Sequence, residues 1–225
     1  MSKLDIEPTL PNDCLTLPPV CQEGVLKVLT TLNEITEKKL WFKPRTLAEI
    51  DTILPNINEL AQKINKSLRD YANFEDAYGA SYKEASKRGR SGARDAAFSV
   101  ASDKAFFAAL EAASRSDIGA GWRPRMAPDQ NEDMDPTTSA AWNANHIAGR
   151  CAAGEVIKDN NQFADNPFSH CLELYRLGAT EIALKQVYEP PKRTECLILH
   201  FPLILPGQKT FVLASLAYPK DGTPR

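Results

Sequence analysis

The stretch from Asn166 to Pro219, NPFSHCLELYRLGATEIALKQVYEPPKRTECLILHFPLILPGQKTFVLASLAYP, decides the fold class of this chain. Asn followed by Pro is a typical helix start and Gly178 stands where a helix ends, so the pattern predicts a helix over 167–177. Three strand-like runs follow, and two Pro-rich turns separate them. The second run, 195–205, is apolar on both faces, which predicts the middle strand of a three-stranded antiparallel meander.

Upstream of this stretch, apolar side chains recur mostly at helical spacing. Helices are expected over residues 22–40, 47–68, 95–114 and 140–159. Thr46 and Glu49 fit a capping box, and Pro55 predicts a kink or a break in the helix that follows. The segment 79–92 is rich in Gly, Ser and basic residues, so a loop or a weak helix is expected there. Helices first and a sheet last predict an α+β fold.

The chain is expected to contain four regions. They are a proline-rich extended arm at 1–21, a helical region at 22–115, an irregular loop at 116–136 and a helix–helix–meander region at 137–225. The second and fourth regions are compatible with one shared domain. The arm and the sheet are the expected routes to any self-association.

Composition excludes several classes of protein. The 225 residues include 27 Lys and Arg against 29 Asp and Glu, a formal net charge of −2, and 43% hydrophobic residues. These values exclude collagen-like and fully disordered chains. The longest apolar run, within 197–205, is far shorter than the roughly 20 residues that a membrane span needs. Five widely spaced cysteines without a CxxC pair, and no signal-peptide pattern, predict reduced thiols and a cytoplasmic location with no membrane partner.

A short basic segment is the most coherent functional signal. Between Ser81 and Arg94 five basic residues accompany a single acid, Glu84. Guanidinium groups and lysines can bind phosphates, and nearby aromatic rings can stack on bases. The expected contact residues are Tyr82, Lys87, Arg88, Arg90, Arg94, Trp122, Arg123 and Arg125. The sequence thus predicts a non-catalytic binding or assembly protein that contacts nucleic acid or another polyanionic or acidic partner, with no cofactor.

The alternative is a Cys/His-dependent hydrolase or a zinc enzyme. Its candidate residues are His146, Cys151, Glu155, His170 and Cys171. The segment 167–171 resembles the Pro-Cys-x-x-Cys helix of zinc nucleoside and nucleic-acid deaminases, whose proton shuttle Glu155 would represent. Phe168 replaces the first cysteine, however, and Glu155 lies only twelve residues before Pro167. The resemblance implies a zinc cofactor, but these departures leave the enzyme question undecided.

A third group of residues lies in the predicted meander. Cys196 and His200 share one face of the middle strand because their spacing is even. They are about 13 Å apart along the strand, too far for a hydrogen bond. Ile182 is expected opposite His200 in the neighbouring strand, which favours a packed histidine over a catalytic one.

Overall fold

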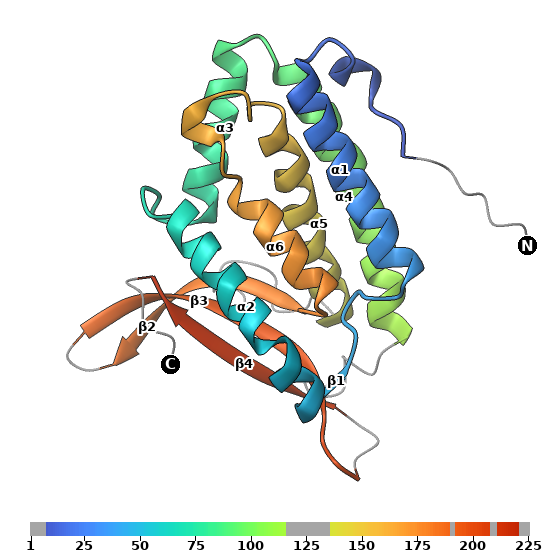
Figure 1. The fold of residues 1–225 in the computed structure, drawn as a ribbon, viewed down its shortest axis with the longest axis vertical. Coiled ribbons are helices and arrows are strands. Elements are labelled where there is room, and N and C mark those ends of the chain that lie inside the picture. Colours follow the sequence, from blue (N-terminus) through green and yellow to red (C-terminus); the bar gives the residue numbers. More distant parts are fainter. Residues whose placement is uncertain (1–7, 116–135, 190–191, 208–210, 221–225) are drawn as a thin grey trace, which may run out of the picture.

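The fold is a bundle of helices with a twisted sheet across one end (Figure 1). The computed structural model describes residues 8–115, 136–189, 192–207 and 211–220. The helices are α1 (Pro19–Glu37), α2 (Leu47–Ser67), α3 (Phe74–Lys87), α4 (Ser91–Arg115), α5 (Pro136–Glu155) and α6 (Pro167–Arg176), with 3-10 turns η1 (Asn12–Cys14) and η3 (Asn161–Phe163). The strands are β1 (Arg45–Thr46), β2 (Glu181–Glu189), β3 (Lys192–Ile204) and β4 (Phe211–Pro219). The predicted α+β class is confirmed.

The helix ends follow the local signals in the sequence. At the start of α2 the backbone N–H of Glu49 donates to the Thr46 hydroxyl, while the Thr46 N–H donates to the Glu49 carboxylate at 2.8 Å. The Asn166 side chain accepts a hydrogen bond from the N–H of Phe168 and so caps α6. Pro55 lies inside α2, which continues through it as one helix. Of the two outcomes predicted at this proline, a kink or a break, the break is therefore wrong.

Helices α4 and α5 form the centre of the bundle through small side chains. The two helices pack on each other, and their buried alanines include Ala97, Ala101, Ala105, Ala109, Ala141, Ala144, Ala148 and Ala152. A Cβ at Gly149 would come within 2.7 Å of the Phe98 ring, so the two helices approach closely there. Small side chains allow this close approach, because the distance between packed helices depends on the size of the side chains at their contact.

Helix α3 decides between the two predicted alternatives, because most of the segment expected to be a loop or a weak helix is helical. Asn73 caps it, and three residues at four-residue intervals, Ala77, Ser81 and Ala85, are buried along one side. Packing of this small-residue face stabilises a helix that contains the unfavourable Gly79. Only a short turn remains between Lys87 and the start of α4.

The sheet contains one strand more than the predicted meander. β2 and β4 flank β3 in antiparallel pairing, and β1 pairs with β3 in parallel at Leu203 and Ile204. Glu181, not Ile182, lies opposite His200. The register is set by the short connection between the strands, which places Glu189 opposite Lys192. The expected pairing of Ile182 with His200 is wrong.

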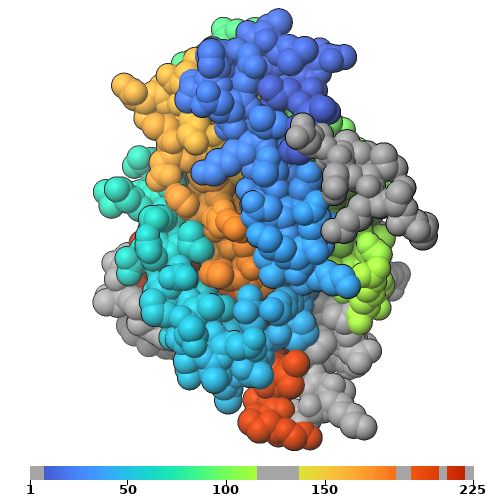
Figure 2. Space-filling view, turned by 45° about the vertical axis from the view of Figure 1, so that its right-hand side comes forward, coloured from blue at the N-terminus to red at the C-terminus, as the bar shows by residue number. Residues whose placement is uncertain are grey.

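The face of β3 that bears Leu197, Leu199 and Phe201 is buried against the helices, and one hydrophobic core extends from the N-terminal segment to the sheet. Cys14 and Leu17 belong to this core, and the Cys14 thiol donates to the carbonyl of Ala93 at 3.4 Å. The part of the expected arm from η1 to Leu17 therefore packs on the chain's own helices, and Pro19 already starts α1. Figure 2 shows α6 lying between α1 and α2. No helix among the described residues is long and apolar enough to span a membrane.

Candidate functional site

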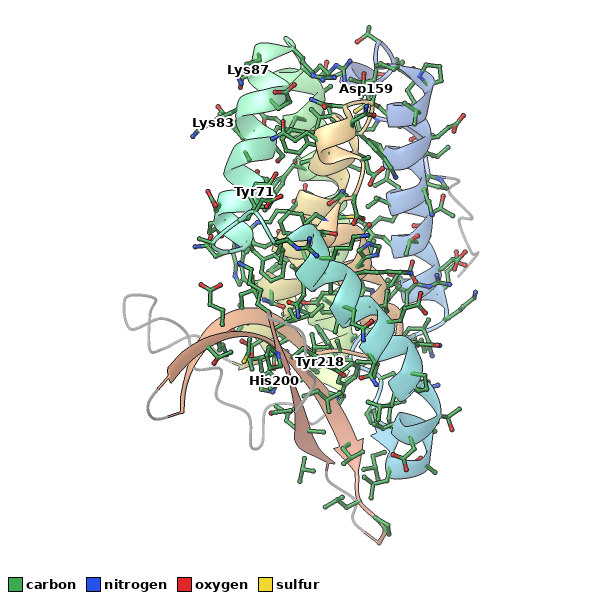
Figure 3. The ribbon with its side chains drawn as sticks, turned by 60° about the vertical axis from the view of Figure 1, so that its left-hand side comes forward. Tyr71, Lys83, Lys87, Asp159, His200 and Tyr218 are labelled. Atoms are coloured by element: carbon green, nitrogen blue, oxygen red, sulfur yellow. The ribbon has the colours of Figure 1, made fainter. Side chains whose placement is uncertain are left out.

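The basic segment of the sequence lies where α3 ends and α4 begins, at the end of the bundle away from the sheet (Figure 3). Helix α5 ends beside it, and Asp159 follows in the chain. The structure separates the cations of this segment into two groups. The arginines turn towards the bundle, whereas the lysines project from α3.

Arg88 and Arg90 both bind the carboxylate of Asp159. Arg90 donates from its two Nη atoms to the two Asp159 oxygens at 2.7 and 2.9 Å, and also to the Val156 carbonyl at 2.9 Å. Arg88 donates to Asp159 at 2.8 Å and to Glu84 at 2.8 Å. The hydrogen bonds from Arg90 hold the pKa of Asp159 below its usual value, and those from Arg88 do the same for Glu84. These two arginines join α3 and α4 to the end of α5.

Arg94 is buried between two tyrosine rings. Its guanidinium carbon lies 4.6 Å from the Tyr78 ring centre and 4.4 Å from that of Tyr82, and its side chain also pairs with Asp95. Arg150 of α5 lies over Tyr78 as well, at 5.2 Å. Cation–π contacts of this kind stabilise a guanidinium that is removed from water. The Arg94 guanidinium therefore packs on one face of the Tyr82 ring, and Arg94 is 4% exposed.

Lys83 and Lys87 point away from the bundle (Figure 3). The Lys87 side chain is 76% exposed, and its closest carboxylate oxygen, on Glu84, lies 3.9 Å away. Lys83 is exposed and forms no ion pair with any carboxylate in the described ranges. Tyr82, the neighbour of Lys83, is 48% exposed. We call Tyr82, Lys83 and Lys87 the α3 row; Lys83 and Lys87 share one side of the helix, and Tyr82 projects from the adjacent side. Lys83 was counted in the basic segment but was not among the residues predicted to make contacts.

The second predicted contact group, Trp122, Arg123 and Arg125, lies outside the described residues.

The cysteines and Glu155 of the alternative enzyme site are buried in the bundle. Burial raises the pKa of the Cys151 and Cys171 thiols well above the usual value, which disfavours the reactive thiolate. The Glu155 carboxylate accepts from Asn166 at 3.1 Å and pairs with Lys158 at 2.9 Å. In the described part of the chain, no three His, Cys, Asp or Glu side chains are grouped as a zinc site would require.

His146 and His170 lie in different surroundings. The His146 ring stacks on Trp142 at 5.6 Å, in a row of rings that continues to Phe106 and the exposed Phe107. The His170 Nε2 lies 3.0 Å from Asp165, whose other oxygen accepts from Ser67 at 2.5 Å. The uncharged aromatic row is a second exposed surface that the sequence did not predict.

A polar cluster on the sheet was also missed. His200 lies between two residues placed directly opposite it in the neighbouring strands: its Nδ1 is 2.9 Å from the Ser215 hydroxyl and its Nε2 is 3.4 Å from Glu181. Lys185 pairs with the other Glu181 oxygen at 3.0 Å. Burial lowers the pKa of His200, and the Glu181 charge opposes that effect. The error of one residue in the predicted register concealed this cluster.

Comparison with protein-family models, with curated proteins and with solved structures finds no match to this chain.

Proposed function

We propose that the protein is a non-catalytic binding protein that contacts single-stranded nucleic acid through the α3 row. The observation that carries the proposal is the exposure of Lys83 and Lys87 beside Tyr82, whose ring rests on the buried Arg94. The two lysines lie one helical turn apart, about 6 Å along the axis. They can therefore contact successive phosphates, and a strand that wraps around α3 can also stack a base on Tyr82, which projects about 100° around the helix from Lys83.

The ion pairs at this end of the bundle leave the positive charge on the lysines. Glu84 and Asp159 are bound by Arg88 and Arg90. A polyanion that approaches the α3 row therefore meets the ammonium group of Lys83, which is unpaired among the described residues, and the exposed one of Lys87, whose long contact with Glu84 is shared with Arg88. Long-range attraction of this kind weakens as salt screens it.

The test is the salt dependence of binding to a labelled single-stranded oligonucleotide, followed by fluorescence anisotropy. Each phosphate contact contributes about 0.7 to the slope of log affinity against log salt for single strands, so Lys83→Ala/Lys87→Ala should reduce its magnitude by about 1.4. Tyr82→Ala should weaken binding without changing the slope. The matched control, Lys27→Ala/Lys38→Ala on the far side of the bundle, should retain the wild-type slope.

Three outcomes contradict the proposal. The first is a wild-type protein that does not bind the oligonucleotide at low salt. The second is a Lys83→Ala/Lys87→Ala variant with the wild-type slope. The third is a loss of binding caused only by Phe107→Ala, which would move the contact to the uncharged aromatic row.

A serine hydrolase is the second candidate, and the cluster of Glu181, His200 and Ser215 is the observation that favours it. The three groups follow the order carboxylate, imidazole and hydroxyl, so His200 Nδ1 can accept the Ser215 proton while Glu181 orients the ring. A fluorophosphonate probe should then label the wild type but neither Ser215→Ala nor His200→Gln. Absence of labelling in the wild type contradicts this candidate.

A further inference from the structure

We propose that β4 is a dimerisation edge, and that a second copy of this chain pairs with it antiparallel, centred on Ser215. In the described residues β4 pairs with β3 alone, while β1 and β2 both lie on the other side of β3. One side of β4 is therefore a sheet edge. An edge strand offers its free backbone groups to another strand.

The pairing pattern identifies the free backbone groups. The N–H of Lys220 donates to the carbonyl of Glu195 at 2.8 Å. Because bonded and non-bonded pairs alternate in an antiparallel ladder, the residues at even positions of β4 bond to β3. The residues at odd positions lie in the non-bonded pairs, so their backbone polar groups are directed outward. They are Phe211, Leu213, Ser215, Ala217 and Pro219.

Pro219 agrees with this assignment. It is an odd position, it has no N–H to leave unpaired, and its carbonyl accepts from the Asn65 side chain of α2 at 3.2 Å. Nothing comparable covers the groups of Leu213, Ser215 and Ala217 in the part of the chain that the structure describes. Ser215 is the middle one of the five outward-facing positions of β4, which makes it the centre of a pairing that uses the whole strand.

The two outer strands of the sheet differ in charge. β2 bears Glu181 and Lys185, and charged side chains on an edge oppose pairing with another strand. Between Val212 and Tyr218 no residue of β4 is charged. Val212 is 41% exposed, so apolar surface also accompanies this edge. β4 thus lacks the protection that β2 has.

The sequence of β4 fits a second copy of itself. With Ser215 opposite Ser215 of the second copy, Leu213 lies opposite Ala217 and Ala214 lies opposite Leu216. Each large side chain meets a small one on both faces of the sheet, and the pairing closes about a two-fold axis. About six backbone hydrogen bonds would form, two for each of the three central outward-facing pairs. This self-complementarity is the observation from which we infer a second copy as the occupant.

Molar mass in solution tests the proposal, because the wild type at high micromolar concentration should show twice the monomer mass by light scattering. Ser215→Lys places two ammonium groups opposite each other at the axis and should give the monomer mass with an unchanged circular dichroism spectrum. Ala183→Lys is the matched control. It introduces a lysine in β2 on the same face of the sheet as Ser215, and this variant should remain dimeric. A monomeric wild type, or a Ser215→Lys variant that stays dimeric, would overturn the proposal.

A thiol cross-link tests the register. All five native cysteines are buried, so Ser215→Cys adds an accessible thiol at the axis. A short bismaleimide should join two Ser215→Cys chains, whereas Ser99→Cys on the exposed face of α4 should not cross-link. Cross-linking of Ser99→Cys alone would contradict the pairing. Neither result depends on nucleic acid, so failure here is distinguishable from failure of the proposed function.

Discussion

The arginines and the lysines of one basic segment have different surroundings. Arg88, Arg90 and Arg94 are turned into the bundle, where carboxylates and tyrosine rings bind them. Lys83 and Lys87, in the same segment, face solvent. A cluster of positive charge in a sequence therefore does not show which cations are available to a partner.

The chemistry of the two side chains explains the difference. A guanidinium is planar and presents several donors in a fixed arrangement, which allows Arg90 to bind both oxygens of Asp159. An ammonium group is compact and strongly hydrated, so a lysine gains less from burial. In this segment the arginines bind groups of the protein itself, and the lysines face solvent.

Removing the carboxylate that the arginines share should have the largest effect. Asp159→Ala leaves Arg90 without its principal acceptor and Arg88 with Glu84 alone, and the side chains of Arg90 and Asp159 are only 18% and 23% exposed. We expect a loss of about 2 kcal/mol in the free energy of unfolding, between the values for exposed and fully buried pairs. Urea denaturation measures it.

The control for this prediction is Glu59→Ala, which removes an exposed pair with Lys63 on α2. It should cost less than about 0.5 kcal/mol. Equal losses in the two variants would contradict a structural role for Asp159.

Arg90→Lys tests the difference between the two cations directly. The variant keeps the charge but loses the bidentate contact with Asp159 and the hydrogen bond to the Val156 carbonyl. We therefore expect the free energy of unfolding to fall by about 1 kcal/mol. Denaturation midpoints of the wild type and the variant provide the comparison. If the Arg90→Lys variant is as stable as the wild type, the bidentate contact with Asp159 does not contribute to stability.

Acid should weaken the same contacts. The pKa of Asp159 is lowered by Arg90, so the folded state binds fewer protons than the unfolded state as the pH falls. The stabilisation is complete above the unfolded pKa of about 3.9 and is lost as the pH decreases through the lower folded value. Unfolding measured from pH 6 down to about pH 3 should show this decline, and Asp159→Asn should show a smaller one.

The smallest effect on stability is expected for the lysines. Lys83→Ala/Lys87→Ala changes exposed side chains, so the unfolding free energy should stay within about 0.5 kcal/mol of the wild-type value. Thermal unfolding checks this. A larger loss would assign the lysines a structural role and remove the contrast with the arginines.

Much of the fold was predictable because its signals are local. The capping box at Thr46, the Asn166 cap and the order of helices followed by a meander were all read from neighbouring residues. β1 was missed because two residues carry no periodic pattern. The sequence left 79–92 between a loop and a weak helix, because the helix there is stabilised by burial of Ala77, Ser81 and Ala85, which local propensity does not report.

The candidate site was less predictable. Residue type indicated the cations, but the partner of Arg90 lies 69 residues away in the sequence, and no local pattern places Asp159 beside it. Likewise, the cluster around His200 depends on strand register, and a shift of one residue exchanges the two faces of a strand. Long-range pairing thus decides which of the predicted residues are accessible.

A double-mutant cycle between Arg90 and Asp159, followed by urea denaturation, tests most directly whether the arginines stabilise the fold. We expect a coupling energy of about 1–2 kcal/mol, because each single variant removes the same two-pronged contact. Losses that add to within about 0.3 kcal/mol would show that the two side chains act independently, and would contradict the division of the segment into structural arginines and free lysines.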